Sequence, residues 1–376
     1  MKLGLVAGEA SGDLLASLLL KGVNTRWPQA QSLGIGGPRM IEQGFEAWWP
    51  SERLAVHGYS EVIQVYFSLL RLRRQLGDRL LVERPAVFVG IDAPDFNLGL
   101  EARLKAQGLK TVHFVCPSIW AWRGGRVHKL AASADHVLCL FPFEPALLAR
   151  AGVRASYVGH PLADAIPLEV PRAAARAALG VGERELVLAV LPGSRRGEVS
   201  HIAADFLRAA VRLKAARPEL RCLLPVAPGV RALVDAAVTA TSAQGAVERI
   251  DGRSHEVLAA CDVALVASGT ATLETALFKR PMVIGYRVAP LSYQLMRHMR
   301  YQSWIGLPNV LAESFVVPEF VQQQMTPEAL AAAVLTWLDD PAACDALAQR
   351  FTAMHHELRR DTARAATEAI AEVAGV

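Results

Sequence analysis

Short apolar runs that alternate with longer helical patterns are the feature of this 376-residue sequence that most restricts its fold. Each run is rich in aliphatic and β-branched residues, and the segment after it repeats its apolar residues at helical spacing. The runs are residues 3–7, 32–35, 86–91, 111–115, 136–140, 156–158, 186–191, 221–226, 247–250, 263–267 and 282–286. Continuous apolar strands separated by amphipathic helices predict parallel sheets that are covered by helices on both faces.

The runs fall into two series, separated by an alanine-rich, proline-flanked stretch at 161–179. Two such series predict two doubly wound, Rossmann-like α/β domains that face each other across a cleft. From about Pro327 onward the pattern is helical only, with a turn at residues 339–341. In sheets of this type ligands bind where the carboxyl ends of strands lead into helices, so the loops at those ends are the candidate sites.

Composition excludes several classes of protein. The hydrophobic fraction of 52% is too high for disorder, yet no uncharged stretch approaches the length of about 18 residues that would suggest a membrane span. The start of the chain turns to glycine and acid too early for a signal peptide, which predicts a cytoplasmic protein. A net charge of +4 without a dense basic run argues against nucleic acid. The five scattered cysteines are expected to be free thiols, mostly buried.

Loops in the first half carry polar groups suited to an acceptor. Residues 8–13 hold two glycines and three polar side chains after the first strand, although an ordinary turn is the alternative. Asp92 follows the apolar run 86–91 directly, where a carboxylate can take a proton from a bound hydroxyl or can simply cap a helix. The loop at 117–123 brings two tryptophans together with Arg123, which suits a sugar face or a lipid head group.

Two loops in the second half are of a phosphate-binding kind. Residues 192–198 expose glycine and serine N–H groups before a helix, and Arg195 can fork onto phosphate oxygens. Residues 267–274 are again small and polar at a helix start, with Glu274 one turn further on. Two such loops in one domain predict convergence on one diphosphate. The spacing of neither a P-loop nor a dinucleotide fingerprint is present.

The segment Tyr59–Leu81 is a helical pattern with more apolar residues than one buried stripe requires. Core packing is the alternative, but an apolar ridge edged by arginines also suits an anionic membrane surface. The residues proposed for this surface are Val62, Val65, Tyr66, Leu69, Leu70, Arg71, Arg73 and Arg74.

Eleven ordered motifs together resemble those of the lipid-A-disaccharide synthase family, bacterial glycosyltransferases of lipopolysaccharide biosynthesis. The motifs are AGEASGD, GGPRM, GIDAPDFN, PSIWAWR, FPFE, VGHPL, LPGSRRGE, ASGTATLE, PMVIGYR, LPN and PEFVQ. The resemblance covers nearly the whole chain and implies a GT-B architecture. It implies an acceptor and membrane-facing domain at 1–165, a UDP-sugar domain at 166–340, and helices at 341–376 that pack back on the first domain.

The activity implied by the resemblance is an inverting transfer of 2,3-diacylglucosamine from UDP-2,3-diacylglucosamine. The acceptor is the 6-hydroxyl of 2,3-diacylglucosamine 1-phosphate, and the products are the β-1′,6-linked lipid A disaccharide 1-phosphate and UDP. The enzyme is expected on the cytoplasmic face of the inner membrane as a peripheral protein, with no cofactor and no metal. The resemblance is compatible with a homodimer.

The resemblance also implies roles for individual residues. Asp92 matches the family's proposed base, and Arg195 matches its essential arginine on the departing UDP. The donor positions are Gly193, Ser194, Arg195, Ser268, Gly269, Thr270, Glu274 and Asn309, and the acceptor-side positions are Glu9, Ser11, Trp120 and Arg123. The sequence departs from the family pattern at His57, Tyr59 and Ser60, which border the proposed membrane and acyl-chain surface.

A different acceptor is the main alternative. A UDP-N-acetylglucosamine epimerase or a peptidoglycan-precursor transferase would share the loop at 267–274, but it would not need the ridge at 59–81. A non-enzymatic nucleotide-sugar binding module would tolerate loss of Asp92. Detergent dependence separates the first alternative from the synthase, and turnover separates the second.

Overall fold

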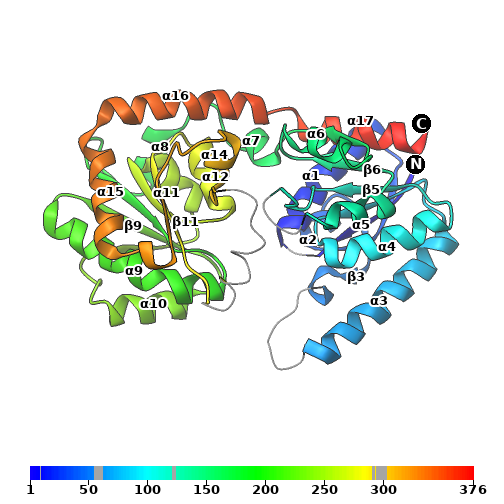
Figure 1. The fold of residues 1–376 in the computed structure, drawn as a ribbon, viewed down its shortest axis with the longest axis horizontal. Coiled ribbons are helices and arrows are strands. Elements are labelled where there is room, and N and C mark those ends of the chain that lie inside the picture. Colours follow the sequence, from blue (N-terminus) through cyan, green and yellow to red (C-terminus); the bar gives the residue numbers. More distant parts are fainter. Residues whose placement is uncertain (9, 55–61, 121–123, 290–292, 294–302) are drawn as a thin grey trace. The chain divides into compact units, whose positions relative to one another are not determined.

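The computed structural model describes residues 1–8, 10–54, 62–120, 124–289, 293 and 303–376, and of residues 10 and 62–66 only the backbone. The chain divides into two compact units. Unit 1 comprises Met1–Asp164 with Glu357–Val376, and unit 2 comprises Ala165–His356. Each unit is built on its own parallel sheet with helices on both faces (Figure 1). The predicted α/β fold class with two doubly wound units is therefore confirmed.

The sheet of unit 1 has the strand order β3-β2-β1-β4-β5-β6-β7. Its strands are β1 (Lys2–Ala7), β2 (Gln31–Gly36), β3 (Glu46–Pro50), β4 (Val87–Ile91), β5 (Thr111–Phe114), β6 (His136–Cys139) and β7 (Ala155–Tyr157). The order reverses between β1 and β4, where Ala7 is paired with Ile91. In open sheets of this class the point of reversal opens a crevice at the carboxyl ends of the two strands.

The helices of unit 1 bury the two faces of this sheet separately. They are α1 (Ala10–Arg26), α2 (Pro38–Ile41), α3 (Val62–Glu83), α4 (Pro94–Ala106), α5 (Arg126–Ser133), α6 (Glu144–Ala149), α7 (Pro161–Ala165) and α17 (Thr362–Ala374). Leu3 and Leu5 of β1 face α1 and α17, whereas Val6 and Phe88 face α3 and α4. This alternation assigns each strand residue to one helix layer.

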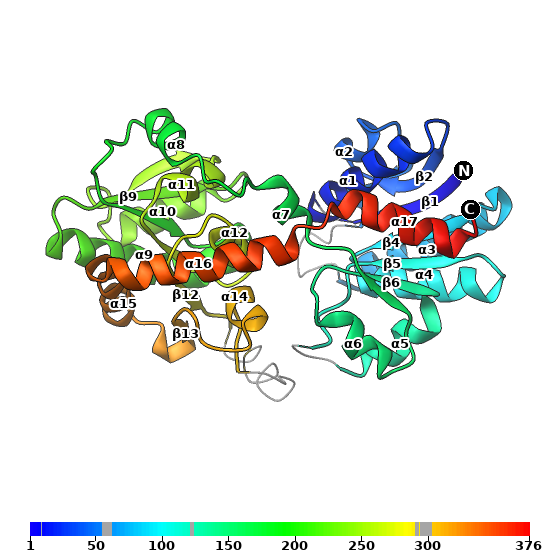
Figure 2. The ribbon, with the colours of Figure 1, turned by 90° about the horizontal axis from the view of Figure 1, so that it is seen from above.

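The end of the chain belongs to unit 1, because α17 packs along α1 (Figure 2). Gly22 lies in the middle of α1, where a glycine normally weakens a helix. A Cβ atom at this position would lie 2.5 Å from the carbonyl oxygen of Ala363 and 2.7 Å from the hydroxyl of Thr367. The absence of a side chain therefore allows the two helices to approach this closely.

The sheet of unit 2 has the order β10-β9-β8-β11-β12-β13, and its order reverses between β8 and β11. Its strands are β8 (Val187–Leu191), β9 (Arg221–Val226), β10 (Glu248–Asp251), β11 (Val263–Ala267), β12 (Met282–Tyr286) and β13 (Glu319–Val321). Its helices are α8 (Arg172–Ala178), α9 (Arg196–Ala216), α10 (Arg231–Ala240), α11 (Ser254–Ala260), α12 (Thr270–Leu277), α14 (Leu307–Leu311), α15 (Pro327–Asp339) and α16 (Pro341–Leu358).

Each of the eleven predicted runs is a strand, and the turn at residues 339–341 separates α15 from α16. Two short edge strands, β3 and β13, were not predicted. Of the segment 341–376, the part up to His356 groups with unit 2 and the remainder with unit 1. All five cysteines are free, four of them buried and Cys344 half-buried. Among the described residues, no helix is both long enough and apolar enough to cross a bilayer.

Candidate active site

The carboxyl ends of β1 and β4 bring two predicted loops of unit 1 together. Because Ala7 pairs with Ile91, Gly8 and Asp92 leave the sheet next to each other at the point where the strand order reverses. Ser11 is exposed in the first turn of α1 beside them. The acceptor-side loop and the proposed base therefore adjoin, as ligand-binding loops do in this class of fold.

Asp92 lies in a strained turn. Its φ angle is 50° and that of Ala93 is 43°, so two consecutive residues with side chains adopt left-handed backbone. Such a conformation costs about 1–2 kcal/mol per residue for an L-amino acid. The backbone N–H of Asp92 donates to the carbonyl oxygen of Phe114 at 2.8 Å, and its own carbonyl accepts from the side-chain amide of Asn97 at 2.8 Å. Strain of this kind is typical of functional sites, where surrounding contacts maintain it.

Trp120 is held by a carboxylate that the sequence analysis did not assign. Its indole N–H donates to Glu144 at 3.1 Å, while the other oxygen of Glu144 accepts from the backbone N–H groups of Leu140 and Phe141. Burial raises the pKa of Glu144 to about 7, and these three donors lower it in part. The Trp120 ring also meets Phe143 edge-on, with ring centroids 5.5 Å apart. The motifs PSIWAWR and FPFE therefore build one aromatic cluster.

The remaining acceptor-side positions, Glu9 and Arg123, lie outside the described residues, as does the segment 55–61 with its departures from the family pattern. Asp13, in contrast, has a clear structural role. Its carboxylate accepts hydrogen bonds from the backbone N–H groups of Gly37, Arg39 and Met40, and so caps α2 from the first turns of α1. Asp13 therefore stabilises the start of α2 rather than the start of its own helix.

The first phosphate-type loop of unit 2 follows β8 and is organised by Glu198. One carboxylate oxygen of Glu198 accepts from the backbone N–H groups of Ser194 at 3.1 Å and Arg195 at 3.2 Å. Gly193 adopts a φ angle of 113°, which a residue with a side chain would not adopt without strain. The side chain of Arg195 is 76% exposed, so the loop presents a guanidinium at the start of α9.

The second loop follows β11, the neighbour of β8, with Val266 paired to Leu191. Both predicted phosphate loops therefore meet at the strand reversal of unit 2. Gly269 precedes Thr270, the first residue of α12, and exposes the amino end of that helix. Ser268 donates through its hydroxyl to the carbonyl oxygen of Ile305 at 3.0 Å, which ties this loop to the segment before α14.

Glu274 has a partner that was not predicted. A carboxylate oxygen of Glu274 lies 3.2 Å from Nε2 of His255 on α11, and this hydrogen bond is the main cause that raises the pKa of His255. The ring of His255 also packs edge-on against Phe278, with centroids 5.3 Å apart. Glu274 is thus oriented by a side chain from the neighbouring helix.

Asn309 lies behind the loops. Its side chain is fully buried, donates to the carbonyl of Val317 and to Glu319, and accepts from the backbone N–H groups of Val316 and Val317. These four bonds use the whole hydrogen-bonding capacity of the amide. In the structure the Asn309 amide is fully buried and its hydrogen bonds support the loop, while its assignment to the donor stays a prediction.

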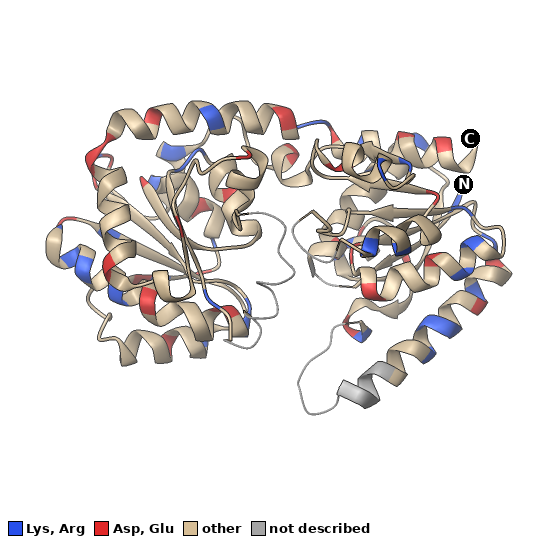
Figure 3. Ribbon diagram, in the orientation of Figure 1, with Lys and Arg blue, Asp and Glu red and all other residues tan. Residues whose placement is uncertain are grey.

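The proposed membrane surface lies on α3, where basic residues follow one another along the helix (Figure 3). For Val62, Val65 and Tyr66 only the backbone is described. Leu69 and Leu70 are half-buried, and Arg71 and Arg74 are exposed. The Arg73 guanidinium packs against Gly99 of α4, because a Cβ there would lie 2.5 Å from it. Leu72 is buried in the core, whereas Phe67 is 64% exposed, so α3 combines a packed stripe with an apolar outer residue.

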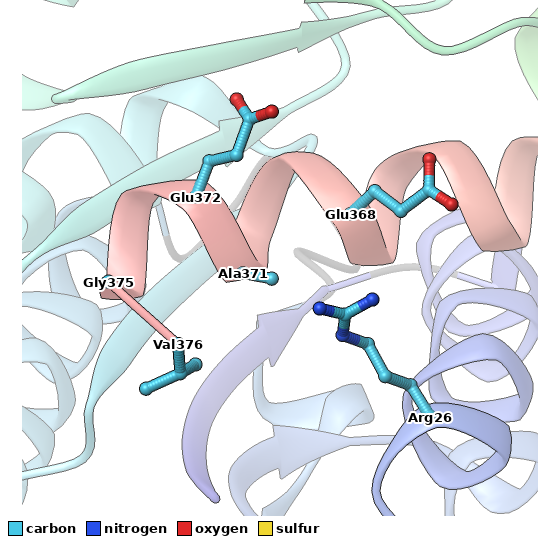
Figure 4. Close-up of a pocket in the computed structure, with 6 residues that line it drawn as sticks. All are labelled: Arg26, Glu368, Ala371, Glu372, Gly375 and Val376. Carbon is cyan, nitrogen blue, oxygen red and sulfur yellow. The ribbon is translucent and has the colours of Figure 1, made fainter.

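A surface hollow between α1 and α17 does not belong to the candidate site. It is lined by Arg26, Glu368, Ala371, Glu372, Gly375 and Val376. Figure 4 shows the Arg26 guanidinium pointing toward α17, on the side of the helix where Ala371 lies. Arg26 is the last residue of α1, whereas the loop at 8–13 leads into the first turn of that helix. The hollow is therefore at the opposite end of α1.

Comparison with known proteins relates the chain to one family of glycosyltransferases. The profile of the lipid-A-disaccharide synthetase family matches residues 3–373. A lipid-A-disaccharide synthase of Albidiferax ferrireducens is 56% identical over 378 residues, covering 99% of this chain and 97% of the relative. That of Aromatoleum aromaticum is 50% identical over 371 residues, covering 98% and 95%.

Among solved structures, the UDP-GlcNAc 2-epimerase of Neisseria meningitidis bound to UDP-GlcNAc resembles this chain with a TM-score of 0.66. It covers 99% of both chains at 10% identity, so the likeness shows the fold alone. The fold is that of GT-B glycosyltransferases and related epimerases. The match to the family profile and to relatives along almost its whole length shows that this chain belongs to the lipid-A-disaccharide synthase family.

Proposed function

We propose that this chain transfers 2,3-diacylglucosamine from UDP-2,3-diacylglucosamine to the 6-hydroxyl of 2,3-diacylglucosamine 1-phosphate. The products are the β-1′,6-linked lipid A disaccharide 1-phosphate and UDP. Membership of the family and the loops at the strand reversals support this proposal. The observation that carries it is Asp92, a carboxylate presented by a strained turn where β4 leaves its sheet.

On the acceptor side, Asp92 acts as the general base. The oxygen of the acceptor 6-hydroxyl attacks the anomeric carbon of the donor as its proton passes to the Asp92 carboxylate. General bases of this kind contribute about 10²–10⁴-fold to a rate. Ser11 beside Asp92 and the Trp120 ring are proposed to bind the acceptor sugar. An aromatic ring fixed by Glu144 offers an apolar face of defined orientation to such a sugar.

On the donor side, the bond between the anomeric carbon and the diphosphate oxygen breaks as the new bond forms, which inverts the configuration. The departing UDP carries the negative charge. The guanidinium of Arg195 and the amino ends of α9 and α12 are proposed to stabilise it. Ser268, Gly269 and Thr270 line the second loop, and Glu274 is assigned to the ribose hydroxyls.

The acylated substrates require contact with a lipid phase. We assign this contact to the outer face of α3, where Phe67 is exposed next to basic residues. An apolar residue flanked by arginines favours binding to an anionic bilayer surface. We therefore propose a peripheral position on the cytoplasmic face of the inner membrane. All residues proposed for the reaction belong to one copy of the chain, and a homodimer is compatible with this arrangement.

Release of UDP by the purified protein tests the proposal. Both acylated sugars are presented in detergent micelles, and the disaccharide product is identified by mass spectrometry. UDP that appears only when both lipids are present supports the synthase. The opposite result is a protein that is inactive with both lipids but turns over unacylated UDP-N-acetylglucosamine in detergent-free buffer. That result would point to an epimerase or to another acceptor.

A further inference from the structure

A cluster of three buried polar side chains, which the proposed reaction does not use, lies beneath the turn of Asp92. Asn97 and Glu101 are one helical turn apart on α4, and His113 is on β5; all three side chains are fully buried. Nδ1 of His113 lies 2.7 Å from Oε1 of Glu101. One further polar atom of each residue has no protein partner among the described residues. Because a buried pair of this kind is a weak source of stability, its presence calls for another role.

Helix α4 packs closely against the sheet at this cluster of polar side chains. Gly90 of β4 faces α4, and a Cβ there would lie 2.1 Å from Oε1 of Glu101 and 2.9 Å from Cβ of Asn97. The helix therefore approaches β4 more closely than a strand residue with a side chain would allow. Burial raises the pKa of Glu101, and the neighbouring His113 opposes that shift. The group thus fixes the distance between α4 and the two strands on which Asp92 depends.

Both backbone polar groups of Asp92 are bound to the elements that this group joins. The side-chain amide of Asn97 donates to the carbonyl oxygens of Asp92 at 2.8 Å and Ile91 at 3.3 Å. The N–H of Asp92 donates to Phe114, the residue that follows His113 on β5. The contact of Glu101 with His113 joins α4, which carries Asn97, to β5, which carries Phe114. The left-handed angles of Asp92 and Ala93 are therefore held from two sides.

We propose that Asn97, Glu101 and His113, here named the Asp92 clamp, are positioning residues that aim the Asp92 carboxylate at the acceptor hydroxyl. The proposal rests on the proposed function, in which Asp92 takes the proton of that hydroxyl. None of the three touches a substrate. Their effect is on the geometry of the proton transfer, where a displacement of about 1 Å can cost about 10²-fold in rate.

Two substitutions separate aiming from folding. Asn97→Asp keeps the size of the side chain but replaces the donating amide by an oxygen that faces two carbonyl oxygens. Glu101→Leu replaces one member of the buried pair by an apolar side chain of similar volume. We expect kcat to fall by about 10²-fold in each, with KM for both sugars and the Kd for UDP within about twofold of wild type. Glu101→Gln keeps an acceptor for His113 and should recover most of kcat.

Thr111→Val is the matched structural control. Thr111 is on the same strand as His113, at the opposite end from Phe114, and its buried hydroxyl donates to the carbonyl oxygen of Ser133 at 2.9 Å. This variant should lower Tm without changing kcat, measured per folded molecule. The clamp is overturned if Glu101→Leu and Asn97→Asp retain kcat within about twofold of wild type while the wild type is active. If the wild-type enzyme shows no turnover of the two lipids, the proposed function itself is overturned, and the clamp with it.

Discussion

Glu198 accepts a hydrogen bond from the backbone N–H of Arg195 at 3.2 Å and also approaches its guanidinium at 3.5 Å. The backbone contact orders the loop before α9. The guanidinium contact is long and exposed to solvent, and such pairs contribute about 0–1 kcal/mol. The Arg195 side chain is therefore presented by an ordered loop but is not committed to its neighbour.

Arg195→Ala should weaken UDP binding and turnover together. A hydrogen bond to a charged group contributes about 1.5–3 kcal/mol, so we expect a rise of about 10–100-fold in the Kd for UDP. Arg196→Ala is the matched control, because Arg196 is the next residue and is also exposed. Calorimetry measures both. Equal effects of the two variants would show that only net charge matters at this helix end.

Glu198→Ala should make the loop that carries Ser194 and Arg195 less ordered. Loss of the carboxylate that caps Ser194 and Arg195 should lower the free energy of unfolding by about 1 kcal/mol. It should also raise KM for the donor, since Arg195 is no longer presented in one orientation. Glu198→Gln retains an acceptor oxygen and should have a smaller effect on both. A Glu198→Ala variant with wild-type Tm and KM would contradict the role assigned to this carboxylate.

The pair of Glu274 and His255 predicts a pH-dependent contribution to stability. The hydrogen bond to Glu274 raises the pKa of His255 above the value of 6.5 expected in the unfolded chain. The protonated pair therefore stabilises the fold fully at pH values below 6.5, and this contribution is lost as the pH rises through the raised pKa. Glu274→Gln should lower Tm more at pH 6 than at pH 9. An NMR titration of His255 gives the shift directly, and a pKa unchanged in Glu274→Gln would refute the pairing.

Gly22→Ala should destabilise the chain, although alanine is the better helix former. The gain in helix propensity is about 1 kcal/mol, whereas overpacking typically costs about 1–3 kcal/mol. Because the added Cβ would meet the backbone oxygen of Ala363 at 2.5 Å, the helix α17 must shift and the second effect should win. Gly197→Ala in α9 adds a Cβ in open space and is the control. Chemical denaturation compares the two, and a stabilised Gly22→Ala variant would contradict this packing.

The central strands of both sheets could be predicted from the sequence because most of their residues are apolar and polar residues are few. Each of these strands is buried on both faces, so the pattern itself carries the signal. The edge strands β3 and β13 could not be predicted in this way. Glu46–Pro50 contains two tryptophans and ends in proline, and Glu319–Val321 has only three residues. Their strand geometry depends on pairing with β2 and β12, which is a tertiary contact.

The motif loops were located by sequence, but their internal contacts were not. Glu101 falls in a helix among charged residues and would be assigned to the solvent face. It is buried because Gly90 lies opposite it in the neighbouring strand. Asn309 was assigned to the donor because it lies in a motif, whereas the structure buries its amide against Val317 and Glu319. A motif therefore identifies which residues matter but does not distinguish contact with a ligand from support of a loop.

Replacement of Asp92 tests the central claim most directly, and the neighbouring carboxylate provides its control. Asp95 lies three positions further along the chain, in the first turn of α4, where it is exposed and pairs with Arg126 at 2.8 Å. Asp92→Asn should lower kcat by about 10²–10⁴-fold, the range of general-base catalysis, with UDP binding unchanged, whereas Asp95→Asn should retain activity. If Asp92→Asn turns over both acylated sugars at the wild-type rate, Asp92 is not the base.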